Sequence, residues 1–190
     1  METKVFIAAC PDYSEEAVQK SVERIFDHYG GAQAFLRYGS KVAIKPNLLM
    51  PRSPDGVTTT HPEVVACVAK LFVNAGAQVS IVESSGGPYN DLVLNLLYKR
   101  CGMEKAAERS GAALNHDCSS KTVRAVSGER DFDILTPLLR PTSSSTSPSS
   151  RPISLPTSPA RAKICSAPSR GSKKRFIIEV FPTNTPLGRC

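Results

Sequence analysis

Hydrophobic and polar positions along the first 139 residues alternate in a pattern that predicts strands and helices in turn. An apolar run over residues 4–9 predicts a short buried strand. Ser14 then precedes Glu15, Glu16 and an apolar stripe at helical spacing, so we expect a helix that is capped by Ser14 and ends at Gly30. The stripe consists of Val18, Val22, Ile25, Phe26 and Tyr29.

The next segment has the pattern of a strand, a helix and a second strand. Residues 41–45 predict a strand that a proline interrupts. Thr60 stands three residues before Glu63, which is the spacing of a capping box, so a helix is expected to start there and to end at Gly76. Residues 78–82 predict the following strand. A unit of this kind implies two parallel strands joined by a right-handed crossover.

A further helix is expected over residues 91–100. Its apolar positions predict that Leu92, Val93, Leu96 and Leu97 face the core.

The last part of the pattern is less regular. Residues 103–109 predict a short helix, and residues 112–117 and 121–126 predict two strands. The apolar run at 134–139 leads toward another element, but the pattern stops there. The expected fold class is therefore α/β, an open and mostly parallel sheet with flanking helices, truncated at residue 139.

Composition changes abruptly after Leu139. The whole chain holds 24 Lys and Arg against 17 Asp and Glu, a net charge of +7. Residues 140–190 contribute 9 basic residues and 1 acidic residue, so they carry +8 and residues 1–139 carry −1. The same segment holds 8 of the 15 prolines, together with 11 serines. We therefore expect an α/β domain over residues 1–139 and an irregular, disordered basic tail over residues 140–190.

Several classes of protein are disfavoured by the sequence. No stretch of about 18 apolar residues is present, so we expect neither a membrane span nor a membrane partner. The first residues lack the features of a signal peptide, which favours the cytoplasm, where thiols stay reduced. No two of the six cysteines have the Cys-x-x-Cys spacing, which argues against a zinc or iron–sulfur site. His116, Asp117 and Cys118 are neighbours on a predicted strand and point to opposite faces, so no metal site is expected there.

Polar residues follow two predicted strands at the edge where open parallel sheets bind ligands. A turn rich in glycine and serine exposes backbone N–H groups to an anion, and Lys45 supplies positive charge. The threonines at positions 58–60 precede a helix N-terminus, which also favours an anion. The candidate ligand-binding residues are Lys45, Asn47, Thr60, His61, Glu83, Ser84, Ser85, Gly86 and Gly87.

Each candidate also has a purely structural interpretation. The Ser-Ser-Gly-Gly run matches neither the dinucleotide-binding fingerprint nor a Walker loop, so an ordinary tight turn also explains it. Lys45 is equally compatible with a solvated strand end, and His61 with a structural role at the helix start. Glu83 is a further candidate for an acid/base group. No nucleophile–base pair can be read from the sequence, so catalytic residues stay unassigned.

Three motifs occur in a fixed order along the chain: KVAIKPNLL at residues 41–49, VTTTHPEVV at 57–65 and NAGAQVSIVESSGG at 74–87. Together they resemble the uncharacterised family called domain of unknown function 362, whose members are often described as iron–sulfur cluster-binding proteins. The resemblance extends over residues 3–139 and brings no settled reaction with it. The family usually has an aspartate where Glu83 stands. Many members carry a C-terminal ferredoxin-like module that this chain lacks, so we expect no cofactor in the chain.

The tail matches a displaced reading frame. Read one base earlier, the codons allowed for residues 141–152 permit ADVIINLPKLKT, the segment with which the family continues. At the same shift, the codons allowed for residues 162–174 permit GKNLFGAIPGLKK, and those for residues 176–188 permit LYHRGFPDKHAFG. Three matches at one offset favour a one-base slip near residues 138–140. The competing interpretation is a genuine basic tail that binds nucleic acid electrostatically, but it leaves the frame match unexplained, so no nucleic-acid partner is expected.

These observations predict a truncated domain whose parent protein binds a small anionic ligand or cofactor at the strand ends, in redox metabolism. A non-catalytic redox-partner or scaffold domain is the alternative. Nucleic-acid binding through a genuine basic tail is the second alternative. The sequence decides neither whether the chain is an enzyme nor its oligomeric state.

Overall fold

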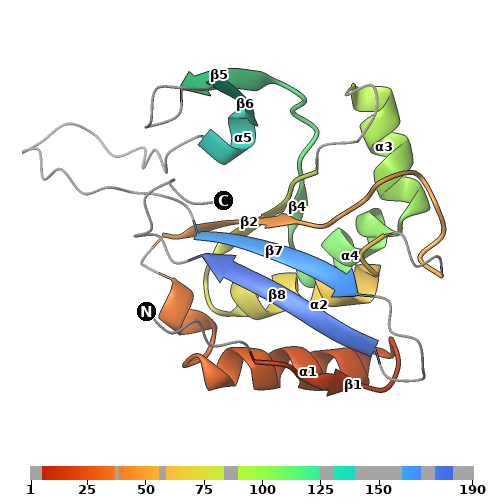
Figure 1. Ribbon diagram of the computed structural model, residues 1–190, viewed down its shortest axis with the longest axis vertical. Helices are drawn as coiled ribbons and strands as arrows, with labels where there is room; N and C mark the ends of the chain where they lie inside the picture. Colours follow the sequence, from red (N-terminus) through yellow and green to blue (C-terminus); the bar gives the residue numbers. More distant parts are fainter. Residues whose placement is uncertain are drawn as a thin grey trace, which may run out of the picture.

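The computed structural model of the chain describes residues 6–36, 39–55, 59–83, 90–124, 131–139, 160–167 and 174–181 (Figure 1). Its helices are α1 (Glu15–His28), the 3-10 turn η1 (Ala32–Phe35), α2 (Pro62–Asn74), α3 (Asp91–Arg100), α4 (Met103–Ser110) and α5 (Thr136–Leu139). Its strands are β1 (Ala9–Cys10), β2 (Lys41–Lys45), β3 (Gln78–Ile81), β4 (Ala113–Leu114), β5 (Ser120–Arg124), β6 (Asp131–Leu135), β7 (Ala160–Ala167) and β8 (Lys174–Phe181).

Six strands form one sheet in the order β1-β8-β7-β2-β3-β4, and β5 and β6 form a separate antiparallel pair. Strand β2 runs parallel to β3 and β7, and β3 runs parallel to β4. Strand β8 is antiparallel to both of its neighbours, so β1 runs in the same direction as β2. The expected open and mostly parallel sheet with flanking helices is confirmed, and β1, β2, β3 and β4 all end at one edge of it.

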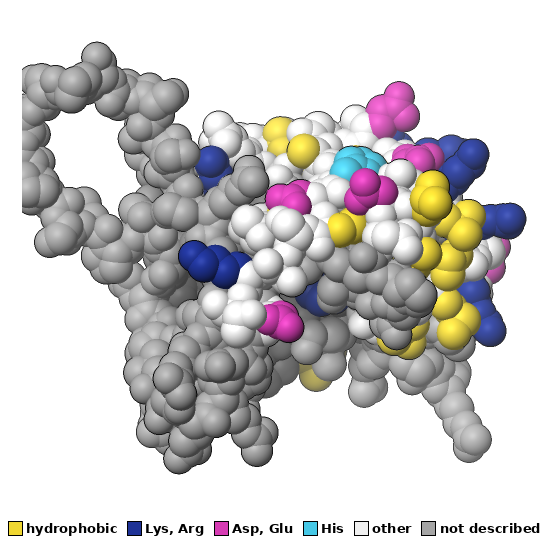
Figure 2. Space-filling model, turned by 90° about the horizontal axis from the view of Figure 1, so that it is seen from above, with side chains coloured by type: hydrophobic (Ala, Val, Ile, Leu, Met, Phe, Trp, Pro, Cys, Tyr) yellow, Lys and Arg dark blue, Asp and Glu magenta, His cyan; other side chains and the backbone are white. Residues whose placement is uncertain are grey.

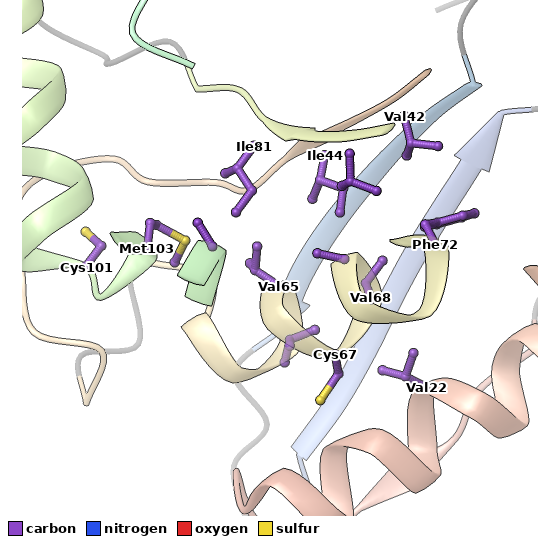
Figure 3. Packing of buried hydrophobic residues seen from close by; sticks show 14 of the residues in the cluster. Val22, Val42, Ile44, Val65, Cys67, Val68, Phe72, Ile81, Cys101 and Met103 are labelled. Carbon is purple, nitrogen blue, oxygen red and sulfur yellow. The ribbon is translucent and has the colours of Figure 1, made fainter. Parts of the chain in front are cut away.

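Helix α2 lies between the sheet and α1 and carries much of the core. Val65, Val68 and Phe72 are 1% exposed or less, and Figure 3 shows them on the side of α2 that faces the sheet. The ring of Phe72 also meets Phe26 of α1 edge-on, with centroids 5.3 Å apart. Each such side chain contributes roughly 1.5–3 kcal/mol on burial. This packing fixes α2 against the sheet and thereby fixes where the N-terminus of α2 points.

The helix starts differ in detail from those that the sequence predicts. Ser14 occupies the N-cap position of α1 but makes no capping hydrogen bond, because its amide and hydroxyl both donate to the carboxylate of Asp12. Helix α2 is capped by His61 rather than by Thr60. The hydroxyl of Thr60 accepts a hydrogen bond from the amide of Asn47 instead, so the predicted capping box does not form.

The orientation of α3 corrects the predicted core residues. Leu92 is 82% exposed and Leu96 is 47% exposed, whereas Leu94, Leu97 and Tyr98 are buried. The predicted inward face is therefore wrong for Leu92 and Leu96. The physical reason is that Tyr98 anchors the helix. Its ring is buried, and its hydroxyl donates to the carbonyl of Asn115 at 3.0 Å and lies 3.4 Å from the carbonyl oxygen of Ile81.

Two strands lie in the segment for which composition predicts an irregular tail. The backbone of β7 pairs with β2 from Val42↔Ala160 to Lys45↔Lys163, and β8 folds back on β7. The expected irregular structure therefore does not hold for β7 and β8. The reason is that the backbone groups along the edge of β2 can pair with an extended segment. Residues 140–159, 168–173 and 182–190 lie outside the described residues.

Candidate functional site

Lys45 and Glu83 come together at the edge where β2 and β3 end. The two residues are 38 positions apart, and the Lys45 ammonium donates a hydrogen bond to Oε1 of Glu83. The Glu83 side chain is 1% exposed, whereas the Lys45 side chain is 40% exposed. The ion pair therefore has one buried member and one member that reaches the solvent.

The backbone explains why this pair forms. The parallel register sets Ile44 beside Ile81, and the amide of Val82 donates to the carbonyl of Ile44 at 2.9 Å. Lys45 is the last residue of β2, and Glu83 stands two residues after the end of β3. A buried carboxylate is costly unless it is paired and hydrogen-bonded. Both Glu83 oxygens have partners, since Oε2 accepts from the amide of Leu48 at 2.7 Å.

A short clasp holds the loop that follows β2. The amide of Asn47 donates to Oγ1 of Thr60 at 2.9 Å, and the amide of Thr60 donates to the carbonyl of Asn47 at 3.0 Å. Leu48 and Thr59 form a backbone bridge beside them. Asn47 and Thr60 thus lie at the predicted edge, but the backbone of Asn47 and the hydroxyl and amide of Thr60 bond to each other and hold the loop.

The hydroxyl of Thr59 is buried in the same clasp. Thr59 is 4% exposed, and within the described ranges its Oγ1 finds no hydrogen-bond partner. A buried hydroxyl without a partner costs about 1–3 kcal/mol. The sequence indicated that the threonines at positions 58–60 favour an anion, but only Thr60 was named as a candidate ligand residue. Thr58 lies outside the described residues.

His61 has a structural role at the start of α2. Its Nδ1 accepts a hydrogen bond from the amide of Glu63 at 3.2 Å, so this nitrogen carries no proton. The ring stacks on Tyr13, with centroids 3.8 Å apart and planes 5° apart. Tyr13 follows the end of β1, and partial burial together with nearby Cys10 raises the pKa of its hydroxyl. Sequence reasoning missed Tyr13, for which the only signal is an aromatic residue just after a predicted strand.

The remaining predicted positions are placed as follows. Ser84, Ser85, Gly86 and Gly87 lie outside the described residues. His116 contacts Asn95, with 2.8 Å between Nδ1 and Oδ1. Over the described part of the chain, no three His, Cys, Asp or Glu side chains come together in a way that could hold a metal ion.

A second polar cluster lies away from this edge and joins α1, α2 and α4. Arg109 makes two 2.8 Å hydrogen bonds to the carboxylate of Glu63 and a 3.0 Å ion pair with Glu15. These bonds from Arg109 hold the pKa of Glu63 below its ordinary value. Cys67 and Lys70 line the same small hollow. Burial and the Glu63 charge raise the pKa of Cys67 to about 12, so its thiol is protonated at neutral pH.

The parallel sheet and its flanking helices define an α/β domain with polar residues at the carboxyl edge of the sheet. The chain belongs to the family described as domain of unknown function (DUF362), which matches residues 42–141.

One curated relative is the "Thylakoid-associated protein sll1697" of Synechocystis sp. (strain ATCC 27184 / PCC 6803 / Kazusa). It is 33% identical to this chain over 78 residues, which make up 41% of this chain and 24% of the relative. The chain therefore matches about a quarter of that protein's length. No solved structure matches the chain at a significant level. No helix among the described residues is long and apolar enough to cross a membrane.

Proposed function

We propose that this chain binds an anionic small molecule or cofactor at the carboxyl edge of its sheet, with Lys45 as the cationic contact. The observation that carries the proposal is the asymmetry of the ion pair. Glu83 is 1% exposed and holds the lysine from the protein side, while the Lys45 side chain is 40% exposed. An anion that approaches from the solvent meets the ammonium before it meets the carboxylate.

The surrounding clasp supports the same proposal. The hydrogen bonds between Asn47 and Thr60 hold the loop after β2 in one place next to Lys45. The Thr59 hydroxyl, which has no hydrogen-bond partner among the described residues, adds a polar group beside this loop. Ser84, Ser85, Gly86 and Gly87 follow directly on Glu83 and stay part of the proposed ligand set. A role in redox metabolism is the part of the proposal that rests on the family resemblance alone.

A thermal-shift titration tests the proposal. The probes are inorganic phosphate, pyrophosphate and adenosine diphosphate, each with its chloride-matched blank. We expect at least one probe to raise the Tm of the wild-type chain and to lose this effect in Lys45→Met. Lys41→Met is the matched control, because Lys41 lies at the opposite end of the same strand. Each variant is compared with its own ligand-free Tm. The proposal fails if no probe stabilises the wild type, or if Lys45→Met responds like Lys41→Met.

We also propose that residues 140–190 are read in a displaced frame. Support comes from the family match, which ends at residue 141 and so coincides with the change in composition after Leu139. Resequencing the gene across codons 136–142 decides the question. The proposal is contradicted if the codons found for residues 141–152, when read one base earlier, cannot encode ADVIINLPKLKT.

A cytoplasmic location is part of the proposal as well. Cys10, Cys67, Cys101 and Cys118 are free thiols, as is usual for proteins in a reducing compartment. Cell fractionation with detection of the native protein tests this point. Recovery in the membrane or exported fraction contradicts it.

A further inference from the structure

His116 lies at the same edge of the sheet as Lys45 and Glu83. One row across the parallel strands β2, β3 and β4 consists of Ile44, Ile81 and Leu114. Lys45 stands one residue beyond this row, and Glu83 and His116 each stand two residues beyond it. Neighbouring strands are about 4.8 Å apart, so the backbones at Lys45 and His116, two strands apart, are about 10 Å apart across the sheet.

Hydrogen bonds fix the loop that carries His116. The amide of Asn115 donates to the carbonyl of Ile81 at 2.9 Å, so the pairing of β3 and β4 continues past the end of β4. The carbonyl of Asn115 accepts from the hydroxyl of Tyr98 at 3.0 Å. The side-chain amide of Asn115 donates to the carbonyl of Asp117, also at 3.0 Å. The backbone is therefore held on both sides of the histidine.

Two side chains of α3 orient the imidazole ring of His116. Its Nδ1 lies 2.8 Å from Oδ1 of Asn95. Because a carbonyl oxygen only accepts, Nδ1 carries the proton and Nε2 has the lone pair in the neutral ring. The ring of Tyr98 meets the imidazole edge-on, with centroids 5.8 Å apart. His116 is exposed, and Figure 2 shows a histidine side chain at the surface on the side of the molecule where α3 lies. A base that a third group orients in this way is a common arrangement in catalysis.

The chain has two other histidines, which provide internal controls. Nδ1 of His61 accepts from the amide of Glu63, so a neutral His61 ring carries its proton on Nε2, opposite to His116. His28 is exposed in the last turn of α1. Helix α1 runs back from the edge where β1 ends, so His28 lies away from the carboxyl edge (Figure 1).

We propose that His116 is the proton acceptor of this edge for a ligand whose anionic group contacts Lys45, an inference that rests on the proposed function. The lone pair of Nε2 takes the proton of an O–H or N–H group of the ligand. The bond to that hydrogen breaks, and its electron pair stays on the ligand. Nδ1 keeps its hydrogen bond to Asn95, so the ring becomes an imidazolium without turning, and no further reactant is required.

The spacing across the sheet defines the class of ligand. About 10 Å of backbone separation between Lys45 and His116 is bridged by an elongated molecule rather than by a single phosphate. The ligand is therefore an anion at one end, through a phosphate or a carboxylate, and a proton donor at the other end.

The tautomer of His116 tests the geometry without any ligand. Long-range proton–nitrogen NMR spectra of the full chain, labelled at histidine, distinguish the two neutral forms on the alkaline side of the histidine titration. We expect the Nδ1–H form for His116 and the Nε2–H form for His61. Asn95→Ala is expected to shift His116 toward the Nε2–H form, and Leu96→Ala on the same helix is the matched control. An Nε2–H form of His116 in the wild type overturns the proposal, and so does a tautomer that Asn95→Ala leaves unchanged.

Acylation by diethyl pyrocarbonate tests whether the ligand reaches His116, because this reagent attacks the unprotonated nitrogen of a neutral imidazole. The probe is adenosine diphosphate, at a concentration about ten times its Kd, and we expect it to slow the acylation of His116 by about tenfold. The rate at His28 is expected to stay unchanged. At the same probe concentration, protection is expected to be lost in Lys45→Met and kept in Lys41→Met. Peptide mapping by mass spectrometry follows both histidines.

Thermal shift and acylation together separate the two proposals. If phosphate, pyrophosphate or adenosine diphosphate raises the Tm through Lys45 but adenosine diphosphate leaves His116 unprotected, the role of His116 is contradicted and the anion site stands. If none of the three probes raises the Tm, both proposals fail. Protection of His116 that persists in Lys45→Met also contradicts both, because the ligand then binds without the lysine.

Discussion

Lys45 forms an ion pair with Glu83 in which the carboxylate is 1% exposed and the ammonium side chain is 40% exposed. The two partners are therefore not equivalent. When Glu83 is lost, Lys45 can turn into the solvent. When Lys45 is lost, the buried carboxylate loses its ammonium partner and keeps the hydrogen bond from the amide of Leu48.

The first prediction compares the two halves of this pair. We expect Lys45→Met to lower the free energy of unfolding by about 3 kcal/mol, because it removes the ammonium partner of a buried carboxylate. Glu83→Gln is expected to cost less, about 1–2 kcal/mol, because the amide oxygen still accepts from Leu48. Urea denaturation at pH 7 measures both values. Equal losses, or a larger loss for Glu83→Gln, contradict the asymmetry.

Two neighbouring threonines give the second prediction. Thr59→Val removes a buried hydroxyl that has no partner in the described part of the chain, and we expect the ligand-free protein to gain up to about 1 kcal/mol in unfolding free energy. Thr60→Val removes the acceptor of the Asn47 amide and is expected to cost about 1–2 kcal/mol. Both substitutions keep the shape of the side chain, so each serves as the control for the other. A loss of similar size in both variants is the contrary outcome in thermal and urea unfolding.

The third prediction concerns the pH dependence of the Arg109–Glu63 pair. Arg109 lowers the pKa of Glu63 in the folded chain below its ordinary value of 4.5. A carboxyl whose pKa is depressed on folding contributes stability above its unfolded pKa, and this stability is lost as the pH falls through the folded pKa. The Arg109 side chain is 45% exposed, so Arg109→Met is expected to cost only about 1 kcal/mol at pH 7.

The difference between wild type and Arg109→Met is expected to shrink below pH 4.5 and to vanish once Glu63 is protonated in both states. Urea unfolding at a series of pH values measures this difference. Lys70→Met is the control, because its contact with Glu15 at 3.5 Å leaves Glu63 untouched. A difference that grows on acidification contradicts the assignment.

The fourth prediction separates two effects at glycines with positive φ. Gly76 has φ 88 and nothing within 4 Å of an added Cβ, whereas Gly102 has φ 74 and meets Cγ of Pro62 at 3.2 Å. Gly76→Ala is expected to cost about 1–2 kcal/mol for the left-handed backbone alone. Gly102→Ala is expected to cost more, because α3 and α4 turn at this residue against a rigid proline ring. Thermal unfolding of the two variants distinguishes them, and a smaller loss at Gly102 counts against this packing.

The fifth prediction concerns thiol reactivity. With its pKa raised to about 12, Cys67 is about one part in ten thousand thiolate at pH 8. We expect iodoacetamide to label Cys67 in the native chain at least about tenfold more slowly than Cys118, which is only partly buried. Peptide mapping by mass spectrometry follows the two sites, and labelling in urea provides the control. Equal native rates contradict the burial of Cys67.

The sequence by itself determined the local elements whose pattern is strong. Alternation and buried aliphatic residues predicted β2 and β3, and helical spacing predicted α1 and α2, because such patterns report which side of an element faces the core. The parallel direction of β2 and β3 followed from the helix between them. The same reasoning predicted that Lys45 and Glu83 end neighbouring strands.

Tertiary structure decided what those residues do. The pairing of Lys45 with Glu83 depends on a register between strands 38 residues apart, which no local pattern contains. Thr60 had the spacing of a cap, but the loop after β2 takes its hydroxyl, so His61 caps α2 instead. Leu92 and Leu96 are apolar residues at helical spacing and were expected in the core. The hydrogen bond of Tyr98 sets the orientation of α3, which leaves both leucines exposed. Each difference has one cause: hydrogen bonds and packing between distant segments outweigh the preference of a short stretch of chain.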